Sequence, residues 1–286
     1  MTDQKLPGAG NNAAKPGGDV PRLSATVLLV RDGPTGLELF MVVRHHQIDF
    51  ASGALVFPGG STDDADRDAR LMALCDGLDG LSEQERAVRV SAAREAFEEC
   101  GVLLARTGKP GGMVDGARAA SLGEAYRARL EAGGIGMADI MEQEGLRLAL
   151  DQLHHYAHWV TPTHMPKRFD THFFLAEAPF DHSLLHDGRE AVDSVWISPA
   201  QALSEAEQGS RTVIFPTRLN LEKLSHCGSV AEAIAFTMAH PVVKVMPVME
   251  RREGKKVMRI PAEAGYSQSE YTIEEVSGGM VTKVGR

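Results

Sequence analysis

The segment from Leu81 to Gly101 constrains the fold of this 286-residue chain more than any other. Ser82 and Glu85 form an S-x-x-E capping box at its start, and Gly101 stands where a helix would end. Between these signals an apolar stripe recurs at helical spacing: Val88, Ala92, Ala96 and Phe97. The pattern predicts an amphipathic helix, which needs a hydrophobic surface against which to bury that stripe.

The same helix carries three glutamates in little more than one turn, Glu95, Glu98 and Glu99, with Arg94 directly before them. At about 100° per residue, the three carboxylates lie within roughly a 100° arc of one face. A face exposed to water tolerates such crowding, because water screens the charges. A face turned into a cleft needs a cation, and oxygen ligands from adjacent turns suit Mg²⁺ or Mn²⁺. Both interpretations, a solvated surface and a metal-binding face, fit the helix alone.

Strands and helices alternate along the rest of the chain. The composition of the segments predicts strands at 22–32, 37–44, 54–60, 155–161, 171–178 and 194–198, the first two joined as a hairpin. Helices are expected at 121–131, 137–153 and 229–238, and two more begin at 199 and at about 219. The segment 243–260 is expected to form a C-terminal hairpin that turns at Gly254. This order predicts an α/β protein with a mixed sheet and helices on both faces.

Composition excludes several classes of protein. The chain has 39 acidic against 30 basic residues, whereas a protein that binds long nucleic acids is usually basic. Three cysteines without a C-x-x-C pair argue against a disulfide framework and favour a reducing, cytoplasmic location. The chain has no uninterrupted run of 18 apolar residues, so no membrane span is expected. Residues 1–20 have the composition of a flexible tail, which leaves 21–286 as a single domain.

The stretch "REAFEECGV" at 94–102 resembles the second half of the Nudix box, G-x5-E-x7-R-E-U-x-E-E-x-G-U, where U is an aliphatic or bulky apolar residue. Ala96 is a small residue at the first U position. In the first half, Gly60 is followed six residues later by Asp66, where the family has glutamate. Family spacing places the arginine eight residues after this acid, but Arg94 lies 28 after it, so about twenty residues are inserted, at about 67–86. The insertion leaves the role of Asp66 open.

The insertion is similar to that of the Nudix branch that contains the peroxisomal coenzyme A diphosphatases and their bacterial relatives. The segments at 158–179 and 190–203 also resemble this branch, so the similarity covers most of the chain from Arg22, around a second, helical insert at about 110–153. The resemblance implies a Nudix-type mixed sheet between helices. It also implies Mg²⁺- or Mn²⁺-dependent hydrolysis of a diphosphate linkage. For CoA or acyl-CoA the products would be 3′,5′-ADP and (acyl-)phosphopantetheine.

The resemblance also implies roles for individual residues. Glu95 and Glu99 are the leading metal ligands, with Glu98 a third, and Arg94 is expected to orient the first glutamate by a charge-assisted bond. Gly59 and Gly60 would let the loop backbone approach the helix. The general base is left between two residues, Glu98 and Glu190, with Glu144 and Glu177 as weaker candidates.

The resemblance also implies that residues before the Nudix box bind the substrate. In the coenzyme A branch this stretch ends G-x3-F-P-G-G, which matches here from Gly53 and makes Arg44 a substrate-binding candidate. A second arginine of that pattern is replaced by Asp49. Binding of the 3′-phosphate would then fall to His45, His46, Lys167 or Arg168, of which Arg168 is favoured because it precedes a strand.

Two other constellations are weaker. His154 and His158 would share a helical face suited to zinc, but their surroundings predict a strand, on which residues four apart lie too far from each other to chelate easily. Cys100 lies beside the glutamates, whose charge would raise the pKa of its thiol, so it is a poor nucleophile.

Three functions therefore stay open. The first is a CoA or acyl-CoA diphosphatase. The second is a hydrolase of ADP-ribose, a dinucleotide cofactor or a diadenosine polyphosphate. The third belongs to another class, a nucleotide-sensing protein that keeps the fold without turnover. In each case the partner is a small nucleotide, neither a nucleic acid polymer nor a membrane, and the chain is compatible with a homodimer.

Overall fold

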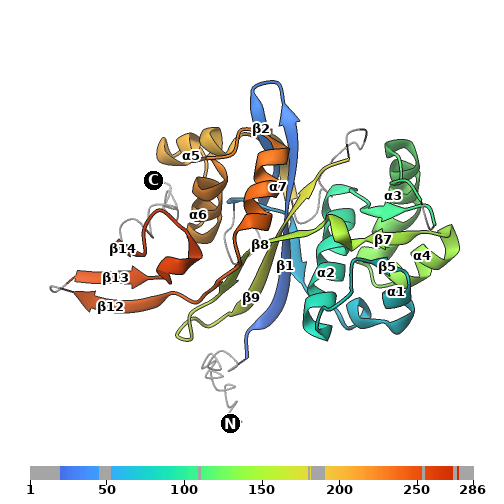
Figure 1. The fold of residues 1–286 in the computed structure, drawn as a ribbon, viewed down its shortest axis with the longest axis horizontal. Coiled ribbons are helices and arrows are strands. Elements are labelled where there is room, and N and C mark those ends of the chain that lie inside the picture. The colour runs from blue at the N-terminus through green and yellow to red at the C-terminus, as the bar shows by residue number, and fades with distance from the viewer. Residues whose placement is uncertain are drawn as a thin grey trace, which may run out of the picture.

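The computed structural model describes residues 20–44, 53–108, 111–179, 181, 191–252, 255–272 and 276. An eight-stranded mixed sheet forms its centre (Figure 1). The main path runs β10-β2-β1-β9-β8-β11, while β3 pairs with β2 and β4 with β1. The strands are β1 Arg22–Gly33, β2 Gly36–Arg44, β3 Leu55–Val56, β4 Gly59–Ser61, β8 His154–Val160, β9 Phe169–Glu177, β10 Ala191–Ile197 and β11 Lys244–Val245. The β1–β9 and β8–β11 pairs are parallel and the others antiparallel, which confirms the predicted mixed sheet.

Helices cover both faces of this sheet (Figure 1). One layer holds α1 Ala69–Ala73, α2 Glu83–Cys100, α3 Gly116–Glu131 and α4 Met137–Glu144, with the short helices η1 Asp64–Arg67 and η2 Leu150–Gln152 and a small sheet of β5 Cys75–Asp76, β6 Ala105–Arg106 and β7 Arg147–Ala149. The other layer holds α5 Pro199–Glu207, α6 Phe215–Leu224, α7 Val230–Ala239, η3 Ala262–Ala264 and a second small sheet of β12 Val248–Arg252, β13 Lys255–Arg259 and β14 Glu270–Thr272. The predicted sandwich of a sheet between helices is therefore confirmed.

Alternate side chains of strand β1 point to opposite sides of the sheet. Because helices cover both sides, β1 is buried on both faces. Val27 and Leu29 join the hydrophobic cluster under α2, while Leu28 and Val30 join the cluster under α6 and α7. The apolar side chains of β1 thus fix the position of α2 against the centre of the sheet.

The predicted α2 and its two end signals are confirmed. The backbone N–H of Glu85 donates to Ser82 Oγ at 3.3 Å, and the Glu85 carboxylate accepts from the backbone N–H of Ser82 at 2.8 Å. Gly101 ends the helix with a left-handed φ of 73°. All four residues of the predicted stripe are buried, so the stripe faces the sheet.

The structure corrects the helix predicted at 137–153. Helix α4 ends at Glu144, because Gly145 adopts a left-handed φ of 63°, and the chain continues as β7 between β5 and β6. A short apolar run fits a buried strand as well as a buried helix, so periodicity could not distinguish them. Helix α3 also begins earlier than predicted, since Asp115 caps it by accepting from the backbone N–H of Arg118 at 2.8 Å.

The C-terminal hairpin is present as β12 and β13, but the segment before it behaves differently from the prediction. Lys244–Val245 joins the main sheet as β11, parallel to β8. Gly254 lies outside the described residues. Among the helices that are described, none combines the length and apolar character needed to cross a membrane.

Candidate functional site

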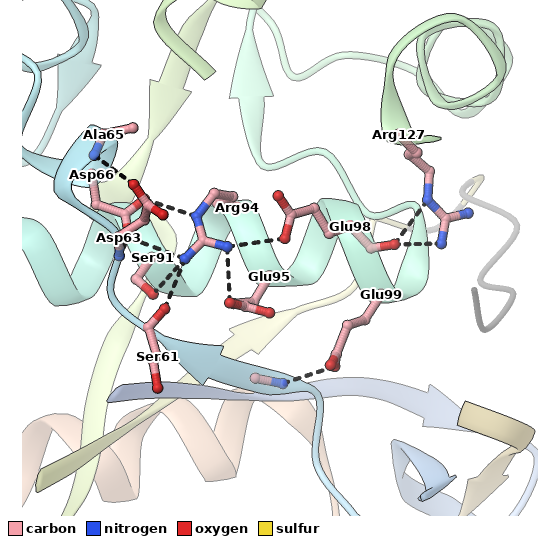
Figure 2. Close-up of polar contacts among 11 residues, drawn as sticks. Ser61, Asp63, Ala65, Asp66, Ser91, Arg94, Glu95, Glu98, Glu99 and Arg127 are labelled. Atoms are coloured by element: carbon pink, nitrogen blue, oxygen red, sulfur yellow. Dashed lines mark hydrogen bonds and ion pairs between the residues drawn. The ribbon is translucent and has the colours of Figure 1, made fainter. Parts of the chain in front are cut away.

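Helix α2 presents Glu95 and Glu99 to the β4 segment, while the carboxylate of Glu98 turns to Arg94 (Figure 2). The backbone N–H of Gly59 donates to Glu99 Oε2 at 2.9 Å. A Cβ atom at position 60 would lie only 2.4 Å from Glu95 Oε1, so a side chain there would displace this carboxylate, and one at position 59 would lie 2.3 Å from the carbonyl oxygen of Ala25. Glu95 is 8% exposed, and Glu98 and Glu99 are half-buried. The interpretation of the glutamates as a freely solvated face is therefore wrong.

Arg94 lies at the centre of the polar contacts in Figure 2. Its Nη1 donates to Glu95 Oε1 at 2.8 Å and to Glu98 Oε2 at 2.9 Å, so the expected bond to the first glutamate is present. The remaining donors reach Asp66 Oδ1 at 2.8 Å, Asp66 Oδ2 at 3.1 Å, the Ser61 carbonyl at 3.0 Å and Ser91 Oγ at 3.2 Å. The guanidinium is thus fully engaged in holding the surrounding carboxylates in place.

Asp66 reaches this centre although it precedes Arg94 by 28 residues. It belongs to η1, is 1% exposed, and also accepts from the backbone N–H of Asp63 at 2.8 Å. The inserted residues fold into α1 and β5 and return the chain to the start of α2. Asp66 therefore forms an ion pair with Arg94 despite the inserted residues between them, which the sequence alone left open.

The site carries excess negative charge. Burial raises the pKa of Glu95 to about 7, although the charge of Arg94 opposes the shift. Burial also raises the pKa of Glu98 in the same way. One guanidinium faces the carboxylates of Asp66, Glu95 and Glu98, and Glu99 adds another a turn away. A hard divalent cation prefers such oxygen donors and would remove the excess charge, so these residues fit a divalent metal.

Arg127 of α3 is part of this arrangement and was not found from the sequence. Its Nε and Nη2 donate to the backbone carbonyl of Glu98 at 3.1 and 2.7 Å (Figure 2). The last turn of α2 has no basic residue of its own, so Arg127 supplies the positive charge that a helix C-terminus favours. No local pattern links the two positions, because the contact joins separate helices.

The other predicted substrate and base residues occupy different places. Arg44 continues the face of β2 that Phe40 and Val42 turn toward α2, and its Nε is buried without a hydrogen-bond partner in the described part of the chain. Arg168 precedes β9 and donates to the carbonyl of Thr161 at 3.2 Å. Three predicted positions, His45, His46 and Glu190, lie outside the described residues, as does Asp49.

The weaker base candidates are placed elsewhere. Glu144, at the end of α4, accepts from the hydroxyl of Tyr126 at 2.7 Å and pairs with Arg118 at 3.5 Å. Glu177 is exposed at the end of β9. Cys100 is fully buried at the end of α2.

The mixed sheet between two helical layers, with an R-E-x-x-E-E helix buried against a Gly-Gly segment, defines a Nudix-type domain. The family model described as the NUDT19 Nudix domain matches residues 77–223. The chain belongs to this family.

Curated proteins and solved structures agree with this assignment. The acyl-coenzyme A diphosphatase NUDT19 of Homo sapiens is 27% identical over an alignment covering 71% of this chain and 64% of that protein. The protein of the same name from Gallus gallus is 25% identical, with 72% and 65% covered. The crystal structure of a NUDIX hydrolase from Alicyclobacillus acidocaldarius is 28% identical and superimposes with a TM-score of 0.62, covering 76% of this chain and 96% of that one. The chain spans 60–65% of the length of the curated relatives it matches.

Proposed function

We propose that the chain hydrolyses a diphosphate linkage in a nucleoside diphosphate derivative, with CoA or acyl-CoA as the first substrates. The observation that carries the proposal is the burial of Glu95, with Glu98 and Glu99 beside it, against a glycine backbone at which a side chain would displace the Glu95 carboxylate. Buried carboxylates of one helix need a cation, and pyrophosphate chemistry uses one. The name of the related human protein, an acyl-coenzyme A diphosphatase, supports the choice of substrate.

In this proposal Glu95 and Glu99 hold the cation, Mg²⁺ or Mn²⁺, and Glu98 completes the acidic set. When bound, the ion would neutralise the pyrophosphate oxygens and lower the pKa of a water molecule. Arg94 does not reach substrate, because its donors are occupied by protein oxygens. Its role is to keep the carboxylates of α2 in one arrangement. Gly59 and Gly60 keep the approach to these carboxylates free of side chains.

Glu98 is our first candidate for the general base. Burial raises the pKa of its carboxyl, which is the direction that favours proton transfer near neutral pH. Glu190, whose position the structure does not describe, is the second candidate. Glu98→Gln should lower kcat by at least about 100-fold and remove the acidic limb of the pH–rate profile, while Glu95 and Glu99 still bind Mn²⁺. An unchanged profile in this variant, together with loss of the limb in Glu190→Gln, would assign the base to Glu190.

Recognition of the 3′-phosphate of CoA is assigned to Arg44 and Arg168. The buried Nε of Arg44, on the sheet face covered by α2, is suited to an anion. Arg44→Gln should raise the KM for CoA about tenfold or more and leave the KM for dephospho-CoA, which lacks that phosphate, unchanged. Arg31→Gln, at the far end of the β1–β2 hairpin, is the matched control. Equal effects on both substrates would contradict the assignment.

A substrate panel tests the whole proposal. The protein is incubated with Mn²⁺ and CoA, acyl-CoA, ADP-ribose, NADH or diadenosine polyphosphates, and the products are identified by mass. The expected products from CoA are 3′,5′-ADP and phosphopantetheine. Preferential cleavage of another nucleotide would reassign the substrate. Failure to cleave any of them, with folded protein and several divalent metals, would favour the nucleotide-sensing alternative.

Glu99→Gln is the matching variant for the metal site. The amide oxygen still accepts from the backbone N–H of Gly59, so the fold should be retained while Mn²⁺ affinity and turnover are lost. Glu83→Gln, exposed in the first turn of the same helix, should retain both. The three cysteines are buried and none of them is in a disulfide, so we also propose a reducing compartment, the cytoplasm in the first instance. Whether the protein forms a homodimer is tested by measuring its mass in solution.

A further inference from the structure

A second group of metal-ligating side chains lies on β8 and β9, apart from the glutamates of α2. His158 Nε2 is hydrogen-bonded to Asp170 Oδ1, and His172 Nε2 lies 3.8 Å from the same oxygen. One ligand atom from each of these three residues falls within 4.8 Å of the others. Such a spacing is close enough for one ion to contact all three.

The pairing of the two strands produces this group. His158 of β8 stands directly opposite His172 of β9, and Asp170 lies two residues along β9 on the same face. The histidine spacing within "HHYAH" does not reveal the site, because two of its three ligands come from the neighbouring strand. His154, which that spacing paired with His158, is not one of the three.

A buried ring nitrogen of His172 indicates that this group binds a ligand. The residue is 6% exposed, and its Nε2 is buried with no hydrogen-bond partner in the part of the chain that the structure describes. Its other ring nitrogen, Nδ1, lies 3.1 Å from His155 Nε2. A buried polar atom without a partner costs free energy, which a ligand at that atom would recover.

Burial changes the pKa values of two members of this group, His172 and Asp170. Burial, together with the proximity of His158 and His155, lowers the pKa of His172 to about 3, so its imidazole stays neutral and able to ligate. Burial opposes ionisation of Asp170, but the hydrogen bond from His158 and the charge of Lys244 outweigh it and lower its pKa. The Nε2 atom of His172, which has no hydrogen-bond partner among the described residues, and the Asp170 carboxylate lie on the same face of β9, 3.8 Å apart.

We propose that His158 Nε2, His172 Nε2 and Asp170 Oδ1 bind a divalent transition metal, Zn²⁺, with water as the fourth ligand. Imidazole ligands favour zinc over Mg²⁺, which prefers the all-oxygen donors of α2. The atoms of His172 and Asp170 that would not bind the metal have contacts of their own. His155 faces His172 Nδ1, and Lys244 Nζ lies 3.4 Å from Asp170 Oδ2, so the oxygen that Lys244 does not hold is the one turned to the imidazoles.

The proposed ion would stabilise the pairing of β8 with β9, close to the Nudix site. Gly60 pairs with Ala25, Ala25 with His172 and His172 with His158, so all four lie in one row across β4, β1, β9 and β8. Adjacent strands are about 4.8 Å apart, which puts the backbones of Gly60 and His172 about 10 Å from each other. An ion that joins β8 to β9 would therefore stabilise the row on which the Gly-Gly segment rests.

Metal titration of the full chain tests the proposal. Chelator-treated protein, in excess Mg²⁺ to occupy the carboxylates of α2, is titrated with Zn²⁺ by calorimetry and with Co²⁺ by visible absorption. We expect one equivalent of Zn²⁺ to bind, the intense visible bands of tetrahedral Co²⁺ to appear, and added Zn²⁺ to raise the unfolding temperature. His158→Gln should weaken Zn²⁺ binding about 100-fold and remove the Co²⁺ bands.

Two matched variants locate the site. His154→Gln, on the same strand but outside the group, should bind Zn²⁺ like the wild type. Glu99→Gln should also keep full Zn²⁺ affinity, which separates this site from the Nudix carboxylates whatever the fate of the proposed hydrolysis. Equal Zn²⁺ binding by His158→Gln and wild type would overturn the proposal. So would loss of Zn²⁺ in Glu99→Gln, or displacement of bound Zn²⁺ by anaerobic Fe²⁺ at equal concentration.

Discussion

The buried ion pair of Asp66 and Arg94 should be measurable as a stability difference. Asp66→Asn keeps the size of the side chain and removes its charge. Asp66 accepts three hydrogen bonds, from Arg94 Nε, from Arg94 Nη2 and from the backbone N–H of Asp63. The amide of asparagine has one acceptor oxygen, and its NH₂ group must then face one of these donors.

The expected magnitude follows from the burial of the pair. Breaking one partner of a buried ion pair typically costs about 3–5 kcal/mol. The lower end applies here, since Arg94 keeps Glu95 and Glu98 as partners and is not left uncompensated. We therefore expect Asp66→Asn to lower the free energy of unfolding by about 3 kcal/mol, measured by urea denaturation with circular dichroism.

Asp63→Asn is the matched control. Asp63 is exposed and caps η1 by accepting from the backbone N–H of Ala65, a role that asparagine fills equally well. It should therefore leave the unfolding transition unchanged. A loss of less than about 0.5 kcal/mol in Asp66→Asn, the range of ordinary surface substitutions, would refute the view that this ion pair fastens the inserted segment to α2.

Three further outcomes follow from contacts in and around α2. Gly60→Ala places a methyl group 2.4 Å from Glu95 Oε1 and should weaken Mn²⁺ binding at least about tenfold, whereas Gly112→Ala, with open space around it, should not. Arg127→Ala removes two charged hydrogen bonds to the end of α2 and should cost about 1.5–3 kcal/mol in urea unfolding; no loss would show that α3 does not support the helix. Burial raises the pKa of Cys75 to about 12, so iodoacetamide at pH 8 should label this cysteine only after unfolding, and labelling of the native protein would contradict its burial.

The elements with local signals were predictable from the sequence. The capping box of Ser82 and Glu85 and the glycine at 101 fixed both ends of α2, and the periodicity between them identified the buried face. Strands β1, β2, β8, β9 and β10 followed from the composition of their segments, whereas β3 and β4 were predicted as one strand and β11 as part of the C-terminal hairpin. The region at 146–150 was misassigned, because its apolar run is equally compatible with helix and strand until the partner strands β5 and β6 are known.

The contacts that escaped prediction join segments that are distant in the sequence. Arg127 lies 29 positions from Glu98, and Asp66 lies 28 from Arg94, so no local pattern joins them. His172 and Asp170 meet His158 only because β8 and β9 pair in one register. Conversely, the glutamate cluster was recognisable because all its members belong to a single helix, whose geometry is fixed by its backbone.

The return of the chain from η1 to α2 has a consequence for detecting relatives. The family match begins at residue 77, after both Gly60 and Asp66. A search pattern with the usual seven residues between acid and arginine would therefore overlook this protein. The acid–arginine contact would tolerate intervening segments of other lengths, provided that they leave η1 beside the helix. Patterns that allow a gap of any length at this point should uncover hydrolase-like chains that rigid motifs now discard.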